Sequence, residues 1–141
     1  MALTSEATTV WNGDLMSGSG KVALDSSKAG EFDVNWKARA EGEANTTNPE
    51  ELLGAAHSAC FSMALSLALA EAGHPPTSIQ TTAAVTFAAG TGVVGSHLLV
   101  SATVPGISEE EFVTFAEDAK KNCPISQALA GIPITLEAEL A

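Results

Sequence analysis

The sequence is poor in basic residues. Six lysines and arginines stand against seventeen aspartates and glutamates, which gives a formal net charge of -11, and Arg39 is the only arginine. Proteins that bind nucleic-acid backbones or anionic membrane surfaces do so with clusters of Lys and Arg. We therefore expect neither nucleic acid nor membrane as a partner of this chain.

Cysteine is also scarce, with only Cys60 and Cys123 in the chain. They lie far apart in the sequence and neither belongs to a CxxC pair, so the sequence predicts no metal site. The N-terminal segment has no basic stretch followed by an apolar one, and we expect a cytoplasmic protein without a secretory signal. Thiols in that compartment are kept reduced, which leaves catalytic, redox-active or inert buried cysteines as the possibilities.

Formal charge is absent from residues 52–70, a segment long enough to span a bilayer. Its flanks are acidic, with Glu50, Glu51 and Glu71, whereas a spanning helix usually carries basic residues on its cytoplasmic side. The segment also contains His57 and several serines. We therefore interpret it as the buried central helix of a soluble protein.

The chain is long enough to bury a core of its own and fits a single domain, residues 1–141. Hydrophobic residues make up 45% of it and charged residues 16%, as is typical of a globular protein. Turn signals such as residues 12–14 predict short strands in the first forty positions. Residues 32–37 alternate between apolar and polar, which predicts a half-buried strand with Arg39 as a solvated charge at its end.

The central helix has a well-defined start. Asn48 is suited to cap it, Pro49 to occupy its first position, and Glu51 to complete a capping box. We expect the helix to run to about Ala72 and to end at Gly73. Because it is apolar on nearly every face, other elements must enclose it. A chain this short has little material for that, so we expect a partner subunit to contribute.

The second half of the sequence predicts further strands and helices. Ser108 and Glu111 form a capping box at the start of one helix. Cys123 follows that helix, and Pro124 is suited to begin a short helix that runs to about Ala130. Apolar alternation predicts strands over residues 79–87, 98–104 and 134–140. Together these elements predict an α+β fold without repeats or linkers.

Two cysteines and one arginine are the minimum set for a thiol peroxidase. A thiol attacks peroxide only as the thiolate, and a second cysteine then condenses with the sulfenic acid. Cys60 lies mid-helix among alanines, and these neighbours alone favour a small buried hydrophobe over a reactive thiol. Cys123 lies at the positive end of a predicted helix, where a thiolate is stabilised. If a guanidinium activates a thiolate here, Arg39 must supply it.

Glu50 and His57 can each be interpreted in two ways, as a structural residue or as a residue with a chemical role. Glu50 in the first turn compensates the helix dipole, and ten residues of straight helix would hold it about 15 Å from Cys60. A joint role of the two therefore requires a kink or a second chain. His57 lies one turn before Cys60, where a packed core histidine competes with a base in a Cys–His hydrolase.

Two motifs resemble those of one family. The run NPEELLGAAHSACFSMAL, residues 48–65, closely resembles the first-cysteine helix of the OsmC/Ohr family of thiol-dependent peroxidases, and NCPIS, residues 122–126, resembles its second-cysteine motif. Residues 36–42 are similar to the arginine segment of the osmotically inducible protein C (OsmC) branch, with Arg39 as the matching arginine. Residues 12–20, where the Ohr branch carries its arginine, have none.

This resemblance implies an OsmC-like fold, with antiparallel sheets packed around a long central buried helix, and an intertwined homodimer with two sites at the subunit interface. It implies reduction of organic hydroperoxides through a Cys60 sulfenic acid and a Cys60–Cys123 disulfide, regenerated by a dithiol reductant of the dihydrolipoyl type. No metal, haem or flavin cofactor is required. The implied catalytic residues are Cys60, Cys123, Arg39 and Glu50.

Two other functions stay open at this point. One is a catalytically silent, stress-induced binding or structural dimer with the same fold. The other is a Cys–His hydrolase that uses His57 and has no need of Cys123. A hydrolase should survive substitution of Cys123, whereas a peroxidase that cycles through a disulfide should not.

Overall fold

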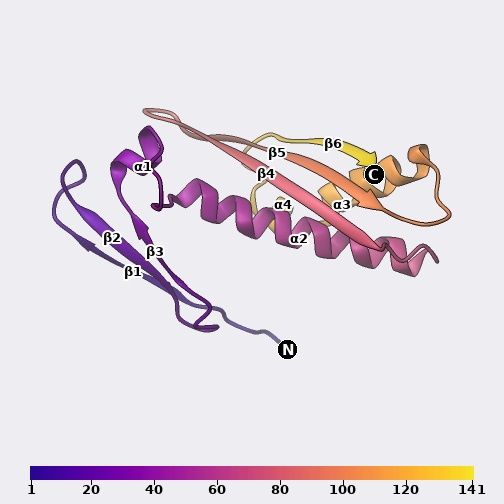
Figure 1. Cartoon of the computed structure of the whole chain (residues 1–141), viewed down its shortest axis with the longest axis horizontal. Coiled ribbons are helices and arrows are strands. Elements are labelled where there is room, and N and C mark those ends of the chain that lie inside the picture. Colours follow the sequence, from indigo (N-terminus) through magenta and orange to yellow (C-terminus); the bar gives the residue numbers. More distant parts are fainter. The chain divides into compact units, whose positions relative to one another are not determined.

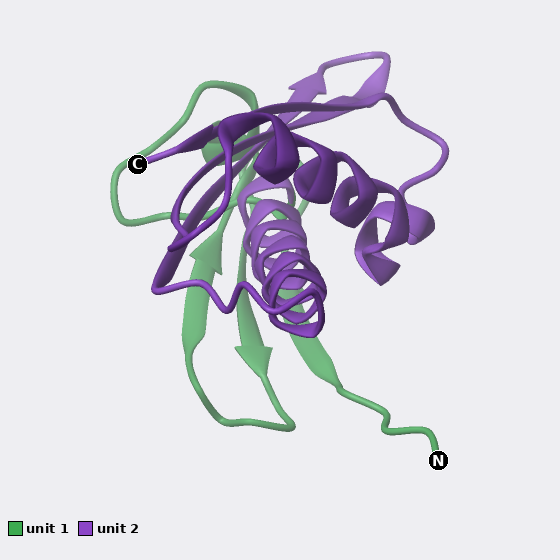
Figure 2. Cartoon of the chain, turned by 90° about the vertical axis from the view of Figure 1, so that its right-hand side faces the viewer, with its two compact units in different colours: residues 1–49 green, residues 50–141 purple.

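The computed structural model describes residues 1–141, which form two compact units, residues 1–49 and residues 50–141 (Figure 2). Helices and antiparallel strands occur in one chain, so the predicted α+β class is confirmed. We describe each unit separately.

The N-terminal unit is built on a three-stranded antiparallel sheet in the order β1-β2-β3 (Figure 1). Its strands are β1 (Ala7–Asn12), β2 (Ser19–Leu24) and β3 (Glu31–Val34). The predicted turn after β1 is present, and Gly13 takes a positive φ of 92° there, a conformation that favours glycine. Val10 and Phe32 stay 61% and 38% exposed, so this small sheet covers little of its own apolar surface.

A short helix, α1 (Trp36–Ala40), follows β3 and carries Arg39. The prediction that Arg39 ends a strand was therefore wrong. The strand stops at Val34 because Asn35 caps a helix: its side chain accepts a hydrogen bond of 2.7 Å from the backbone N–H of Ala38.

The C-terminal unit begins with the long helix α2 (Pro49–Glu71), which matches the predicted helix closely. The elements that follow are β4 (Ser78–Ala88), β5 (Gly92–Thr103), α3 (Glu109–Asn122), α4 (Pro124–Ala128) and β6 (Ile134–Leu140). The predicted capping box of α3 is confirmed, since Ser108 Oγ accepts from the Glu111 N–H at 3.2 Å and the Glu111 carboxylate accepts from the Ser108 N–H.

The second sheet has the order β4-β5-β6 and contains one parallel ladder. The pair β4–β5 is antiparallel, as expected from the short turn that joins the strands. In contrast β6 runs parallel to β5, so the expectation of purely antiparallel sheets was wrong for this ladder. The reason is the connection: α3 and α4 form a long crossover between β5 and β6, which returns the chain in the same direction.

The core of this unit lies between the sheet and the helices α2 and α3. Alternate residues of β5, among them Leu98 and Val100, are buried on the face that packs with Phe61 of α2 and Phe112 of α3. In Figure 1 α2 runs beside β4 and β5, and Figure 2 looks along it with α3 on the same side of the sheet. The residues of α2 that are fully buried include Phe61, Leu65 and Leu69, one helical stripe.

The opposite face of α2 is apolar but uncovered within one chain. Met63 is 73% and Leu67 60% exposed, so the expected enclosure of the helix is met on one side only. By length and a mean hydropathy of 1.6 the helix would also pass as a membrane span, a test that core helices of soluble proteins satisfy as well. Its packing in the core identifies it as a core helix with a second apolar face.

Candidate active site at the cysteine pair

The structure brings the two cysteines together in the C-terminal unit. Cys60 lies in the middle of α2 and is half-buried, whereas Cys123 lies between α3 and α4 and is fully buried. Both are free thiols, and Cys60 packs against the core cluster that contains Cys123, close enough for the Cys123 thiol to raise the pKa of Cys60. Residues far apart in the sequence thus form one contact pair at the surface of α2.

Cys123 occupies a junction of two helices. Its N–H donates to Ala119 O at 2.9 Å, closing α3, and its carbonyl accepts from the N–H of Gln127 at 3.0 Å, opening α4. The backbone of Cys123 is extended, with φ -58° and ψ 123°, because the residue before a proline disfavours the helical conformation and Pro124 follows. This break turns the chain so that α4 starts next to Cys60.

The surroundings of Cys60 oppose ionisation of its thiol. Burial raises the pKa of Cys60 above its ordinary value, and the Cys123 thiol raises it further. The backbone N–H of Ile125, in the first turn of α4, favours the thiolate and lowers the pKa of Cys60, but the balance is upward. The positive end of α4 therefore acts on Cys60. A cation is not among these influences, so thiolate formation at neutral pH needs a further positive charge.

His57 is a fully buried member of a hydrogen-bonded set and not a base for Cys60. Its Nδ1 lies 2.7 Å from Ser96 Oγ and its Nε2 lies 2.8 Å from Ser126 Oγ. Burial lowers the pKa of this imidazole, which keeps it neutral. Because both ring nitrogens are engaged and the side chain is 0% exposed, the arrangement disfavours the Cys–His hydrolase.

Glu50 is in the same unit as the cysteines but does not reach them along the helix. It is only 6% exposed in the first turn of α2. Since α2 is one helix from Pro49 to Glu71, the rise between Glu50 and Cys60 is about 15 Å. No kink brings them together, which leaves a second chain as the way for Glu50 to act on Cys60.

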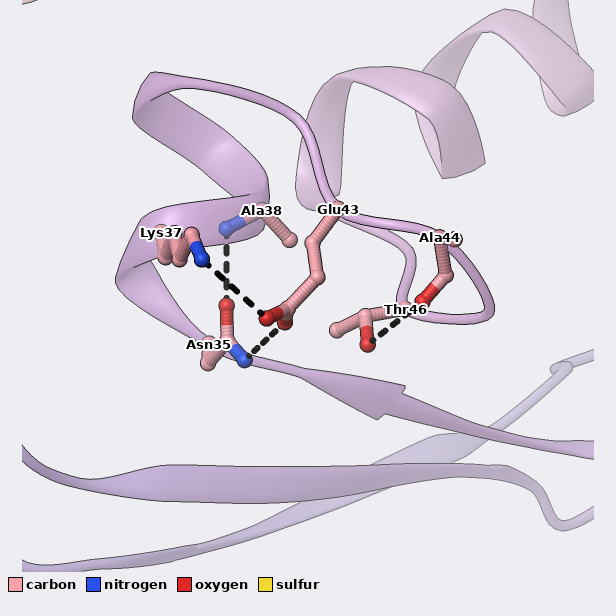
Figure 3. Close-up of polar contacts among 6 residues, drawn as sticks. All are labelled: Asn35, Lys37, Ala38, Glu43, Ala44 and Thr46. Atoms are coloured by element: carbon pink, nitrogen blue, oxygen red, sulfur yellow. Dashed lines mark hydrogen bonds and ion pairs between the residues drawn. The ribbon is translucent and has the colours of Figure 1, made fainter.

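Arg39 belongs to the N-terminal unit, on a helix that polar contacts hold in place (Figure 3). Asn35 Nδ2 donates to Glu43 Oε2 at 2.7 Å, and Lys37 Nζ lies 3.8 Å from Glu43 Oε1. The hydrogen bond from Asn35 lowers the pKa of Glu43, so that this carboxylate stays charged. One helical residue, Lys37, and the cap Asn35 are thus tied to Glu43 in the following loop, which gives a five-residue helix a defined place.

Three groups of this site were not predicted from the sequence: the hydroxyls of Ser96 and Ser126 and the amide of Ile125. Ile125 and Ser126 lie within the second-cysteine motif, so the motif could have pointed to both residues. Ser96 lies in a strand with no motif around it and had none. No group of three or more His, Cys, Asp or Glu side chains is placed to hold a metal ion.

A half-buried thiol on a core helix, packed against the cluster that holds a buried thiol at a helix junction, is the kind of arrangement that two-cysteine redox chemistry requires. The family model described as OsmC-like protein matches residues 42–137. The chain is also 43% identical over 143 aligned positions to a protein named peroxiredoxin OsmC from Escherichia coli (strain K12), with 99% of each chain covered. The chain therefore belongs to the OsmC family, and by this relationship it is a peroxidase.

Solved structures agree with this assignment. An OsmC-like protein from Mycoplasma pneumoniae superposes with a TM-score of 0.77 at 19% identity, covering 100% of this chain and 99% of the other, which supports the fold. An organic hydroperoxide resistance protein from Elizabethkingia anophelis gives a TM-score of 0.70 at 28% identity, covering 100% of this chain and 97% of the other. The predicted OsmC-like fold is thereby confirmed.

Proposed function

We propose that this protein reduces organic hydroperoxides to alcohols, with Cys60 as the attacking thiol and Cys123 as the resolving thiol. The observation that carries the proposal is the packing of two free thiols of unequal exposure, with Cys60 against the core cluster that contains Cys123. The names of the relatives, a peroxiredoxin and an organic hydroperoxide resistance protein, support the same chemistry.

The difference in exposure supports the two roles. Cys60 is half-buried and has surface through which a peroxide can approach, whereas Cys123 is 0% exposed. A resolving cysteine needs only to reach the sulfenic acid of its partner. A peroxidatic cysteine needs access to solvent.

The cycle balances in three steps. The Cys60 thiolate attacks the distal peroxide oxygen, the O–O bond breaks, and the alkoxide leaves and takes up a proton as the alcohol. The Cys123 thiol then attacks the Cys60 sulfenic acid, which forms the disulfide and releases water. A dithiol of the dihydrolipoyl type reduces the disulfide by exchange and becomes a disulfide itself. No metal, haem or flavin takes part.

Activation of Cys60 is the step for which we propose Arg39 and Glu50. The pKa of the thiol is raised by burial, and Arg39 is the only guanidinium in the chain. A guanidinium beside the sulfur would favour the thiolate, and the buried carboxylate of Glu50 would orient that guanidinium. Because α2 separates Glu50 from Cys60, we propose that the site is completed by a partner chain.

A homodimer follows from the second apolar face of α2. Met63 and Leu67 are large and exposed, and isolated soluble proteins rarely leave such a helix face uncovered. A second copy would cover it and bring the partner's Glu50 within reach of Cys60. A cytoplasmic location suits a pair of cysteines that are free thiols at rest.

The proposed preference for organic substrates rests on a small exposed apolar surface around Cys60. Phe61 and Leu65 are fully buried in the core and so do not line the approach to Cys60. Met63, Ala56 and Ala59, which lie within a turn of Cys60, provide the exposed apolar surface there. This surface would favour an alkyl or aryl hydroperoxide over hydrogen peroxide.

The test is a thiol count and intact mass of reduced protein treated with cumene hydroperoxide, repeated on Cys60→Ser and Cys123→Ser. We expect the wild type to lose both thiols with the mass of two hydrogens, and neither variant to form an intramolecular disulfide. Cys123→Ser should gain two or three oxygens at Cys60 under excess peroxide. Hydrogen peroxide is run in parallel, and faster turnover with it would refute the substrate preference.

Retention of both thiols by the wild type under excess peroxide would overturn the proposal. The silent binding or structural dimer would then be the better account of this chain. Full activity of Cys123→Ser with a single thiol reductant would overturn the resolving role alone.

A further inference from the structure

The buried residues around His57 have no role in the cycle above. His57, Ser96 and Ser126 are 0%, 2% and 5% exposed and come from α2, β5 and α4 respectively. One imidazole thus joins three elements through hydrogen bonds of 2.7 and 2.8 Å. Such a set is costly to bury unless every member is paired, and here no buried side-chain polar atom lacks a partner.

The set lies directly behind the two cysteines. His57 precedes Cys60 by three residues on α2, and Ser126 follows Cys123 by three residues at the start of α4. Neighbouring residues of α4 therefore act on neighbouring turns of α2: the Ile125 N–H lowers the pKa of Cys60, and the Ser126 hydroxyl is hydrogen-bonded to the His57 ring at 2.8 Å. These two contacts fix where α4, and Cys123 before it, lie against α2.

Only one of the two contacts is independent of the reacting sulfur. When Cys60 becomes a sulfenic acid, the charge and substituents of the sulfur beside Ile125 change, whereas the hydrogen bond between Ser126 and His57 involves neither sulfur. The helix α4 has five residues and no side-chain cap at its start, so it contributes little to holding itself in place. The link through His57 is then a hold on α4 that does not depend on the reacting sulfur, in addition to the backbone bond from Cys123 to Ala119 of α3.

We propose that His57 is a positioning residue for disulfide formation, which it serves by holding α4 through Ser126 so that the Cys123 sulfur faces the Cys60 sulfenic acid. Ser96 fixes the imidazole ring from the opposite side. This inference rests on the proposed two-cysteine cycle. It assigns His57 to the resolving step and not to peroxide cleavage.

The experiment separates the two steps in single-turnover reactions of the full chain with cumene hydroperoxide. Sulfenic acid is trapped with dimedone to time the first step, and loss of both thiols times the second. The variants are His57→Asn, Ser126→Ala and Ser126→Thr, the last of which keeps the hydroxyl. Ser62→Ala is the matched control, because Ser62 is on the same helix and bonds to Thr81 of β4 at 2.7 Å, away from α4.

We expect Ser126→Ala and His57→Asn to slow disulfide formation about tenfold or more, since a small misplacement of reacting groups is costly. Sulfenic acid formation should stay within about twofold of the wild type, and over-oxidation of Cys60 should rise as the second step slows. Ser126→Thr should restore most of the rate, and Ser62→Ala should behave as the wild type.

An unchanged disulfide rate in Ser126→Ala, a variant that removes one oxygen and should fold, would overturn the inference. So would an equal loss in both steps, which is the result of general destabilisation. If the wild type itself forms no Cys60–Cys123 disulfide, the proposed function fails instead, and the two failures are thereby distinguished.

Discussion

At the scale of single residues, the environment of Cys60, the proposed attacking thiol, disfavours the thiolate form of its side chain. Burial and the Cys123 thiol raise the pKa of Cys60, and one backbone N–H at the start of α4 opposes them. A peroxidase that works near neutral pH must supply a cation to this sulfur. Arg39 is the only arginine in the chain, so a single substitution tests whether a guanidinium supplies that charge.

We expect Arg39→Gln to move the pH midpoint of Cys60 alkylation upward. The neutral side chain no longer favours the thiolate, so the thiol ionises at higher pH and the alkylation rate at pH 7 falls about tenfold or more. The measurement is the rate of iodoacetamide labelling against pH in a Cys123→Ser background, where Cys60 is the single thiol. The pH midpoint of Arg39→Lys should lie between that of the protein with Arg39 and that of Arg39→Gln.

Lys121→Gln is the control for general loss of positive charge, because Lys121 is an exposed cation on α3. It should leave the midpoint where it was. An Arg39→Gln profile that overlays its parent would show that another group activates Cys60.

At the scale of elements, the close packing of α2 on the sheet depends on a glycine. Gly54 is buried on α2, and a Cβ at this position would lie 2.9 Å from the carbonyl oxygen of Ala83 in β4. Real Cβ atoms do not approach so closely, and the obstacle is backbone, which cannot swing away. The helix therefore has to move if a methyl group is added.

Gly54→Ala should lower the free energy of unfolding by about 1–3 kcal/mol, as overpacking does, despite a gain of about 1 kcal/mol in helix propensity. Urea denaturation followed by circular dichroism measures it. Gly131→Ala is the control, since nothing lies within 4 Å of the Cβ it would add and its φ is not positive. That substitution should be neutral or slightly stabilising. Equal stability of the two variants would contradict the packing argument.

Elements with local signals could be predicted, and those set by distant contacts could not. Ser108 and Glu111 mark the start of α3 by chemistry within one turn, and apolar alternation locates β4 and β5. The helix α1 was missed because an alternation over residues 32–37 is too short to outweigh the cap at Asn35. The direction of β6 follows from a crossover and not from its own residues.

The same division holds for the site. The two motifs identified Cys60 and Cys123 as a pair, but their contact depends on α4 returning to α2, which no local pattern encodes. His57 is separated by 39 and 69 residues from the serines it binds, so its role as a junction was not visible in the sequence. Its neutrality follows from burial, which also comes from the tertiary structure.

At the scale of the whole molecule, a single chain leaves a face of its core helix uncovered. The exposed residues Met63 and Leu67 are one turn apart on α2, opposite the stripe that contains Leu65. The chain carries a net charge of -11, so two copies repel each other at long range and their association needs apolar contact. A homodimer through this face satisfies that need and would place the partner's α2 beside Cys60.

We expect Met63→Glu and Leu67→Glu each to convert the dimer to a monomer, because a carboxylate buried opposite a second α2 is unpaired and the net charge of the pair increases. Sedimentation velocity measures the assembly and cumene hydroperoxide turnover measures the site. Turnover should fall about tenfold or more with dissociation, since in the proposed dimer Glu50 acts from the partner chain. Val113→Glu, at a 36% exposed residue of α3, is the control that should stay dimeric and active. A monomeric variant with full turnover would show instead that one chain holds a complete site, and the role of the second copy would be limited to covering α2.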